Sequence, residues 1–484
     1  MFFNSVDFII FFSAVFAFFF VIPHRFRWLY LLSASLFFYG YLKPVFLVFL
    51  VAPIALVYVI GLKIAAIPAS PESKKKRKHF LWLGLASALT ALVVCRYTDF
   101  IYGTFASLAG FDFKPLKFLV PIGLSFYSFK MVSYLIDVYN ENAPAEKHFG
   151  YFALYVSFFP QVFSGPIDRA VHFIPELKKN VHFDMDRIIA GLQLIAWGIF
   201  KKMVIADRLG IFVDEIFRNP HQQGLNILMA AYFYAFQIYC DFSGYTDIAI
   251  GVSKMLGFNS MKNFDFPYFS KSITQFWNRW HISLSTWLRD YLFLPIAYAV
   301  MRPIKTDQLC RIKTETWGYV TGMMCTMLIA GLWHGPNWTF VVWGMLHGLY
   351  LIIGYTTKKA RKKFVKTIRL NKFPGLHRAL SIFITFNLLS LAWIFFRAES
   401  LQQAFAYLHY LQLKPSGKGT AYLMFNLLIV TIFILLEVLV KNRKKIKVFD
   451  RIPDVVKVAG FALFICLILI FAVDKANEFI YFQF

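Results

Sequence analysis

Long apolar runs separated by short polar segments make up most of this 484-residue chain. A helix needs about 20 residues to cross the hydrocarbon core of a bilayer. Twelve runs come near or exceed that length, which predicts an all-α polytopic membrane protein with about 11–12 transmembrane helices. The runs fall near residues 7–22, 28–42, 44–66, 80–96, 118–139, 187–209, 225–251, 316–333, 337–356, 378–396, 421–440 and 455–473.

Three further regions are apolar but do not have the pattern of a simple span. Residues 101–117 and 150–166 are interrupted by Gly and Pro, so we expect re-entrant or interfacial pieces that other parts of the protein cover. Residues 272–300 mix Trp and Tyr with charged side chains, which predicts a helix that lies partly in the membrane plane or lines a cavity.

The chain is expected to form a single membrane domain over residues 1–484. We place peripheral N-terminal spans in 1–100, a catalytic core in 101–357 and C-terminal spans in 358–484. No internal repeat is visible, so an inverted-repeat transporter gains no support.

Composition agrees with the pattern, because 58% of the residues are hydrophobic and 16% are charged. Soluble domains have about 45–50% apolar and about 25% charged residues. The five cysteines are scattered, mostly in apolar runs, and form no CxxC pair. The cysteines therefore indicate neither a disulfide framework nor a zinc site.

The formal net charge of +25 comes largely from three short basic blocks, at residues 74–78, 358–372 and 441–447. Short basic loops between spans lie on the cytoplasmic side under the positive-inside rule, which argues against nucleic-acid binding. All three blocks share one side if both termini are extracytoplasmic. The start has no basic segment and no small-residue cleavage site, so we expect the first span to be retained.

His334 stands between two apolar runs, in the sequence Trp333-His334-Gly335-Pro336-Asn337. An ionisable group at membrane depth is energetically unfavourable and is a functional candidate by default. Burial keeps imidazole neutral and basic, which suits removal of a proton from an attacking hydroxyl. The alternative is a histidine that is hydrogen-bonded between helices and serves packing alone. The functional interpretation is favoured, with Asn337 in a supporting role.

His281 is a second histidine in apolar surroundings. On one continuous helix, Trp277 and Ser285 would share its face, one turn to either side. Other polar residues close in sequence are Arg279, Ser283, Arg289 and Asp290. This pattern predicts a cavity-lining site with one imidazole and guanidinium groups that bind anions. The alternative is an interfacial helix anchored by its tryptophans.

Two carboxylates, Asp241 and Asp247, lie with Ser243 in the apolar run 225–251. They need partners or water, so they either pair with Arg279 or Arg289 or line a polar tunnel. A buried ion pair that fixes two helices is an equal alternative. Neither acid has a histidine or an acid four residues later, so no metal site is expected.

Other groups give weaker signals. His347 is interpreted as a packing residue with a minor chance of a proton role. Residues 121–127 and 161–169 are expected to be helix breaks. The sequence contains no Gly-x-Ser-x-Gly elbow, Walker A loop or dinucleotide fingerprint. If the chain is an enzyme, direct transfer assisted by a base therefore fits better than a covalent intermediate.

Several ordered motifs resemble the membrane-bound O-acyltransferase family, in the bacterial branch of the alginate and peptidoglycan O-acetyltransferases and the teichoic-acid D-alanyl transfer protein. The resemblance covers nearly the whole chain. Its motifs are residues 118–127, 163–166, 239–247, 276–291, 331–335, 393–397 and 481–484.

The resemblance implies a helical fold around a central tunnel, in a bacterial cytoplasmic membrane. It implies a cytoplasmic thioester donor, either acetyl coenzyme A or an acylated carrier protein, and no permanently bound cofactor or metal. The acceptor would be a hydroxyl of an extracytoplasmic polysaccharide or cell-envelope glycan, in some systems with a separate extracytoplasmic partner. His334 would be the essential histidine and His281 a second important polar group.

One departure from the family pattern bears on the acceptor. Residues 292–298 stand where alginate-type proteins carry a glycine-rich segment, which weakens the case for alginate itself. The N-terminal segment resembles the polysaccharide acetylation branch more than the D-alanyl branch. The alternatives that remain open are D-alanyl transfer to teichoic acid and, in another class, a proton-coupled transporter.

Overall fold

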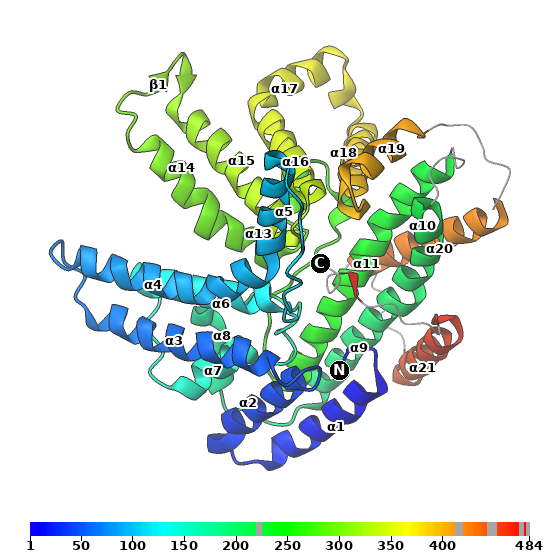
Figure 1. Cartoon of the computed structure of the whole chain (residues 1–484). Helices are drawn as coiled ribbons and strands as arrows, with labels where there is room; N and C mark the ends of the chain where they lie inside the picture. Colours follow the sequence, from blue (N-terminus) through cyan, green and yellow to red (C-terminus); the bar gives the residue numbers. More distant parts are fainter. Residues whose placement is uncertain (219–224, 412–419, 443–452, 474–478, 481–484) are drawn as a thin grey trace. The chain divides into compact units, whose positions relative to one another are not determined.

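The structure is a computed structural model that describes residues 1–218, 225–411, 420–442, 453–473 and 479–480 (Figure 1). Within these residues the regular elements are helices, apart from one antiparallel hairpin of β1 (Gln308–Leu309) and β2 (Ile312–Lys313). The chain is therefore an all-α polytopic membrane protein. It divides into two units, residues 1–197 with 245–262, and residues 198–244 with 263–484.

Helices α9 and α11 each contribute to both units, and the other helices belong to one. The first unit contains α1 (Val6–Val21), α2 (His24–Gly40), α3 (Phe46–Ala66), α4 (Lys74–Leu92), α5 (Thr98–Ala109), α6 (Leu124–Tyr139), α7 (Phe149–Ser157), α8 (Ala170–Lys178) and most of α9 (Met185–Ile199). The second contains α10 (Asp207–Arg218), most of α11 (Leu225–Met255), α12 (Ile273–Trp277), α13 (Ile282–Leu288), α14 (Leu294–Met301), α15 (Thr314–His334), α16 (Trp338–Thr356), α17 (Lys358–Thr367), α18 (Pro374–Arg397), α19 (Leu401–His409), α20 (Thr420–Asn442) and α21 (Asp454–Phe471).

Short π-helical and 3-10 segments lie between several of these helices. They are η1 (Val93–Tyr97), η2 (Phe200–Ala206), η4 (Pro267–Phe269), η5 (Arg289–Phe293) and η6 (Leu370–Lys372). Through η1 and η2, the helices on either side combine into long runs at Lys74–Ala109 and Met185–Arg218.

Each of the twelve apolar runs predicted from the sequence contains a helix. Seven helical stretches in the described residues are long and apolar enough to cross a membrane, which makes the chain a multi-pass membrane protein. They are Phe46–Ala66, Lys74–Ala109, Met185–Arg218, Trp338–Thr356, Pro374–Arg397, Tyr422–Asn442 and Asp454–Phe471. The larger count of 11–12 spans stays a prediction.

Three expectations about helix boundaries were wrong. Residues 101–109 continue the α4–α5 run instead of forming a separate re-entrant piece. The expected span 118–139 becomes helical only at Leu124, because Pro121 and the left-handed Gly123 (φ 77°) precede it. Region 272–300 is not one helix, because the chain breaks between Trp277, where α12 ends, and Ile282, where α13 begins. From Ile282 the helix continues through η5 into α14.

In the first unit, α3, α4 and α6 pack against one another, and α6 also carries the buried Lys130. Lys130 Nζ on α6 donates to Gln161 Oε1 (2.6 Å) and to the Tyr155 carbonyl (3.0 Å). Gln161 Nε2 in turn donates to Asp168 Oδ2 (2.7 Å), and Asp168 Oδ1 accepts the Met261 backbone N–H (3.1 Å). A buried chain of hydrogen bonds thus ties α6 to the turn region at 161–169 and to the loop after α11.

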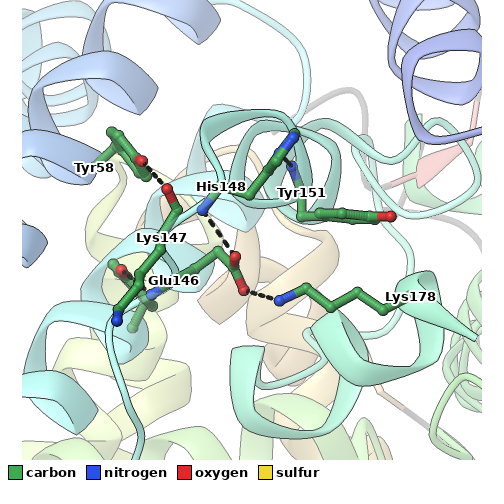
Figure 2. Close-up of polar contacts among 7 residues, drawn as sticks. Tyr58, Glu146, Lys147, His148, Tyr151 and Lys178 are labelled. Carbon is green, nitrogen blue, oxygen red and sulfur yellow. Dashed lines mark hydrogen bonds and ion pairs between the residues drawn. The ribbon is translucent and has the colours of Figure 1, made fainter. Parts of the chain in front are cut away.

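At the edge of the first unit, the segment before α7 is held by polar contacts (Figure 2). Glu146 accepts from Lys178 Nζ (2.6 Å) and from the His148 backbone N–H (2.9 Å). His148 Nδ1 accepts the Tyr151 N–H and so caps α7, while the Tyr58 hydroxyl donates to the Lys147 carbonyl (2.6 Å). These contacts explain where α7 begins and how α8 and α3 are tied to it.

In the second unit, α15 and α16 form an antiparallel hairpin whose closeness depends on two glycines (Figure 1). A Cβ on Gly331 would lie 2.2 Å from the Phe340 carbonyl oxygen, and one on Gly344 would lie 2.2 Å from that of Met327. The turn at residues 335–337 closes the hairpin, and Asn337 Oδ1 caps α16 by accepting the Thr339 N–H (3.0 Å). Helices α12 and α18 pack against α16.

Candidate active site

His334 is the last residue of α15 and is 3% exposed. Its ring lies among aromatic rings from three helices, with centroid separations of 4.8 Å to Trp333, 4.8 Å to Trp343 and 5.0 Å to Phe396. Gly335 ends the helix directly after it, so the side chain stands at a helix terminus and not in the middle of a span. A histidine surrounded by aromatic rings is shielded from bulk water, as a general base at membrane depth requires.

His281 is fully buried and lies at the break between α12 and α13. Its backbone is in the left-handed region (φ 43°, ψ 55°), which a non-glycine residue rarely adopts. The Asn263 carbonyl oxygen holds this break by accepting the Ile282 N–H (2.8 Å). Strained backbone of this kind occurs where a side chain must be aimed, so the break supports a functional role for His281.

The side chain of Asn263 fixes which nitrogen of His281 carries the proton. Asn263 Oδ1 accepts the backbone N–H (3.1 Å) and the hydroxyl (2.8 Å) of Ser283, so this atom is an acceptor. Because His281 Nδ1 lies 3.1 Å from the same oxygen, Nδ1 must donate, and the neutral ring keeps its lone pair on Nε2. Burial lowers the pKa of His281, which lies outside the candidate spans, to about 3. The neutral ring is therefore the resting form.

Trp333 connects the two predicted histidines. Its ring centroid lies 4.8 Å from that of His334 and 5.9 Å from that of His281. The ring of Phe242, on α11, packs against that of His281 in a T-shaped arrangement, with a centroid separation of 4.7 Å. The second unit thus brings together His281 and His334, which are 53 positions apart in sequence, around one indole.

A third histidine, His347, joins this group and was interpreted from the sequence as a packing residue. It is fully buried on α16, and its Nδ1 accepts the indole N–H of Trp277 (3.3 Å). Its ring lies 4.6 Å from Trp343, which in turn contacts His334. The available signal was the four-residue spacing from Trp343 to His347, which places both on the face of α16 that meets α12.

The carboxylate Asp241 forms an ion pair within the second unit, but not with Arg279 or Arg289 as the sequence suggested. Asp241 Oδ1 accepts from Lys202 Nζ at 2.7 Å, and Asp207 accepts from the same ammonium group at 2.8 Å. Asp241 Oδ2 also accepts the Ile480 backbone N–H (2.9 Å). All three charged side chains are buried, so this arrangement matches the alternative of an ion pair that fixes helices.

The remaining candidates take different places. Ser243, also on α11, accepts a hydrogen bond from Lys201 Nζ (2.8 Å). The expectation that Trp277, His281 and Ser285 share one helix face was wrong, because the chain breaks at His281, and the Ser285 hydroxyl donates instead to the Trp280 carbonyl (2.9 Å).

The charged candidates near α13 take other positions. Arg289 Nε donates to its neighbour Asp290 (2.7 Å), and its side chain is 60% exposed. The Arg279 carbonyl accepts the Asp265 N–H (2.9 Å), which gives this residue a backbone role in the loop before α12. Asp247, on the other part of α11, belongs to the first unit.

The fold is that of a helical membrane protein, and the family comparison makes the chain an acyltransferase. The chain belongs to the membrane-bound O-acyltransferase family, because the model of that family matches residues 141–392. All three histidines lie inside the matched region.

Curated relatives cover most of the chain. It is 36% identical to the probable alginate O-acetylase AlgI of Azotobacter vinelandii over 409 residues, 84% of this chain and 76% of the relative. Identity to the peptidoglycan O-acetyltransferase of Helicobacter pylori is 34% over 405 residues, 78% of this chain and 72% of the relative. Identity to the teichoic acid D-alanyltransferase of Streptococcus thermophilus is 30% over 340 residues, 67% and 77% of the two chains.

Proposed function

We propose that this acyltransferase moves an acetyl group from a cytoplasmic thioester, either acetyl coenzyme A or an acylated carrier protein, across the membrane. The acceptor is a hydroxyl of an extracytoplasmic polysaccharide or cell-envelope glycan, or a partner protein that completes the transfer. The observation that carries the proposal is the pair of buried histidines, His281 and His334, around Trp333. The names of the alginate and peptidoglycan O-acetyltransferase relatives support acetyl as the group and a glycan as the acceptor.

In the proposed mechanism, His334 removes the proton from the acceptor hydroxyl as its oxygen attacks the thioester carbonyl carbon. The new carbon–oxygen bond forms, the carbon–sulfur bond breaks, and the leaving thiolate takes the proton back from His334. General-base assistance of this kind accelerates a reaction about 10²- to 10⁴-fold.

The hydrogen bond between Asn263 and His281 indicates whether the free ring nitrogen of His281 accepts or donates a hydrogen bond. Because Nδ1–H faces Asn263 Oδ1, the lone pair on Nε2 suits acceptance of a hydrogen bond and not donation to an oxyanion. His281 is therefore assigned to orienting the acceptor by accepting a hydrogen bond from a hydroxyl that neighbours the one that reacts. Ser283 and Asn337 support the site through the Asn263 hydrogen bonds and the cap of α16.

A second candidate is D-alanyl transfer to teichoic acid, which the teichoic acid D-alanyltransferase relatives favour. The same base and the same thioester chemistry serve both groups. Mild-base release of the transferred acid from the producing cell's surface glycans separates them, because acetate indicates the first function and D-alanine the second. A proton-coupled transporter is disfavoured by membership of the acyltransferase family.

We further propose that the protein lies in the bacterial cytoplasmic membrane with both termini outside and the basic helix α17 on the cytoplasmic side. The catalytic core is assigned to residues 101–357, with peripheral spans before and after it. The basic block at 441–447 lies mostly outside the described residues. Cysteines introduced at Lys75 and Lys362 in a cysteine-free background should react with a membrane-impermeant maleimide only after the membrane is opened.

The deciding experiment compares ester-linked acyl groups on the surface glycans of cells that express wild type, His334→Ala or a control at matched membrane levels. His79→Ala is the control, because it makes the same substitution at an exposed histidine on α4. The proposal expects ester content to fall to background in His334→Ala and to stay at the wild-type level in His79→Ala. Full ester content in His334→Ala would overturn the assignment of the base.

A further inference from the structure

Helix α17 is basic on one side and apolar on the other. Its lysine face consists of Lys358, Lys359, Lys362, Lys363 and Lys366. An apolar stripe lies opposite, where Ala360 and Phe364 are one turn apart and Ile368 follows one turn later at the end of the helix. Residues 358–372 contain eight basic side chains and no acidic one, so no charge of this segment offsets the lysines.

Both sides of α17 are open to the surroundings. All five lysines are exposed, and in the apolar stripe Phe364 is 63% and Ile368 50% exposed. Further apolar side chains follow, with Phe373 62% exposed. Among the described elements, α17 packs mainly against its neighbours in the chain, α16 and η6. Because apolar side chains are stabilised when they leave water, the stripe favours an apolar environment that the described part of the chain does not supply.

The connections of α17 place it at a bilayer surface. It joins the ends of two candidate spans, Trp338–Thr356 and Pro374–Arg397 (Figure 1). Arg369, in the left-handed region (φ 56°), follows α17, and η6 then leads into α18. Ten residues of helix cover only about 15 Å. A short helix that is attached at both ends to spans stays where those spans leave the membrane.

The two faces together fit lipid better than a soluble partner. A helix in the plane of the interface directs its apolar side toward the acyl chains and its basic side toward the headgroups. Lysines and arginines next to a span attract anionic headgroups. An acidic soluble protein could also meet the lysine face, but it would leave Phe364 and Ile368 uncovered on the opposite side. A bilayer that contains anionic lipid matches both faces at once.

We propose that α17 is an interfacial helix that binds anionic phospholipid headgroups through its lysine face, with Phe364 and Ile368 among the acyl chains. Binding holds the adjacent ends of α16 and α18 at one depth in the membrane. These two helices carry Trp343 and Phe396, whose rings contact His334. The inference concerns the lipid partner and does not depend on the proposed acyl donor or acceptor.

The test uses the full-length protein, without its natural cysteines, in nanodiscs of phosphatidylcholine. A single cysteine at Phe364→Cys carries a fluorescent label. Quenching is measured with phosphatidylglycerol or phosphatidylcholine that has brominated acyl chains, at equal mole fraction. Leu463→Cys, at an exposed position of α21, is the control for ordinary contact with lipid. A label at Lys362→Cys reports on the lysine face, with acrylamide as the quencher in water.

We expect brominated lipid to quench the label at Phe364, with a quenching constant about 3- to 10-fold larger for phosphatidylglycerol than for phosphatidylcholine. Molar salt shortens the screening length to about 3 Å and should reduce this preference to within about twofold. Replacing the five lysines with Gln should have the same effect, whereas replacing them with Arg should preserve the preference. The label at Leu463 should show no preference, and acrylamide should quench the label at Lys362 more than that at Phe364.

Two kinds of result would overturn the inference. Equal quenching by the two brominated lipids at low salt would show that the lysine face does not select anionic headgroups. Quenching of the Phe364 label by acrylamide, with none by either lipid, would mean that α17 extends into water and that its charge serves a soluble acidic partner. The salt comparison uses the unaltered lysine face, so it decides the question even where the glutamine variant does not fold.

Discussion

Asn263 Oδ1 lies 3.1 Å from His281 Nδ1, and the same oxygen accepts both the backbone N–H and the hydroxyl of Ser283. One amide oxygen therefore sets the orientation, the tautomer and the local backbone of a buried histidine. The carbonyl of Asn263 adds a bond to the Ile282 N–H on the other side of the break. Asn263 is thus the residue on which the geometry of His281 depends most directly.

Replacing Asn263 with Ala should lower acyl transfer roughly 10- to 100-fold. The ring of His281 would lose the partner that fixes Nδ1–H, and a small displacement of an orienting group has effects of this size. Ester content of the surface glycan, at matched membrane levels, is the measurement. Asn278→Ala, at an exposed position after α12, is the matched control and should retain wild-type ester content. Unchanged transfer in Asn263→Ala would show that His281 needs no such partner.

Replacing Asn263 with Asp should change the pH dependence instead. A carboxylate beside Nδ1–H favours the imidazolium form, so it raises the pKa of His281 from its lowered value of about 3. Below the raised pKa the ring is charged and Nε2 can no longer accept a hydrogen bond. The acid limb of the rate–pH profile should therefore move to higher pH than in wild type. A profile that superimposes on that of wild type would contradict the orienting role.

The apolar pattern predicted helix in all twelve runs and the burial of His281 and His334, because an ionisable side chain with apolar neighbours is visible in the sequence. It did not predict the break at His281, which depends on a left-handed residue held by Asn263 from a separate loop. The partner of Asp241 was missed for a similar reason. Lys202 lies on a π-helical turn about 40 positions away, and nothing in a single sequence indicates that distant pairing. The hydrogen bond from Trp277 to His347 was also not visible, because the two residues lie on different helices 70 positions apart.

Three substitutions at ion pairs should reduce the stability of the fold by different amounts, with the largest loss at the buried Lys202. Lys202→Met leaves Asp207 and Asp241 buried without their shared cation, which should destabilise the fold by about 3–5 kcal/mol. Asp241→Asn should do less harm, since Lys202 keeps Asp207. Asp290→Asn, at an exposed pair, should have almost no effect. Thermal unfolding in detergent measures all three, and an equal effect of Lys202→Met and Asp290→Asn would contradict the role of the buried pair.

Lys130 and Asp168 should show coupling in a double-mutant cycle. Both are buried and are linked through Gln161, so Lys130→Met leaves an uncompensated carboxylate. Adding Asp168→Asn removes that charge, and we expect the double variant to be destabilised less than the sum of the single variants, by about 1 kcal/mol or more. Thermal unfolding of the four proteins gives the coupling free energy. Simple additivity would mean that the two charges act independently.

Gly344 should be required for activity although it touches no reacting group. A Cβ there would lie 2.2 Å from the Met327 carbonyl oxygen, so Gly344→Ala must push α15 away from α16. His334 is the last residue of α15, and its ring contacts Trp343 of α16. Moving the two helices apart therefore changes the position of the His334 ring. We expect a loss of about 1–3 kcal/mol in stability and at least a roughly 10-fold loss of transfer. Gly354→Ala on the same helix meets nothing within 4 Å, and alanine favours helix, so this control should be as active as wild type and no less stable. Equal behaviour of the two variants would show that the close approach of the helices does not position His334.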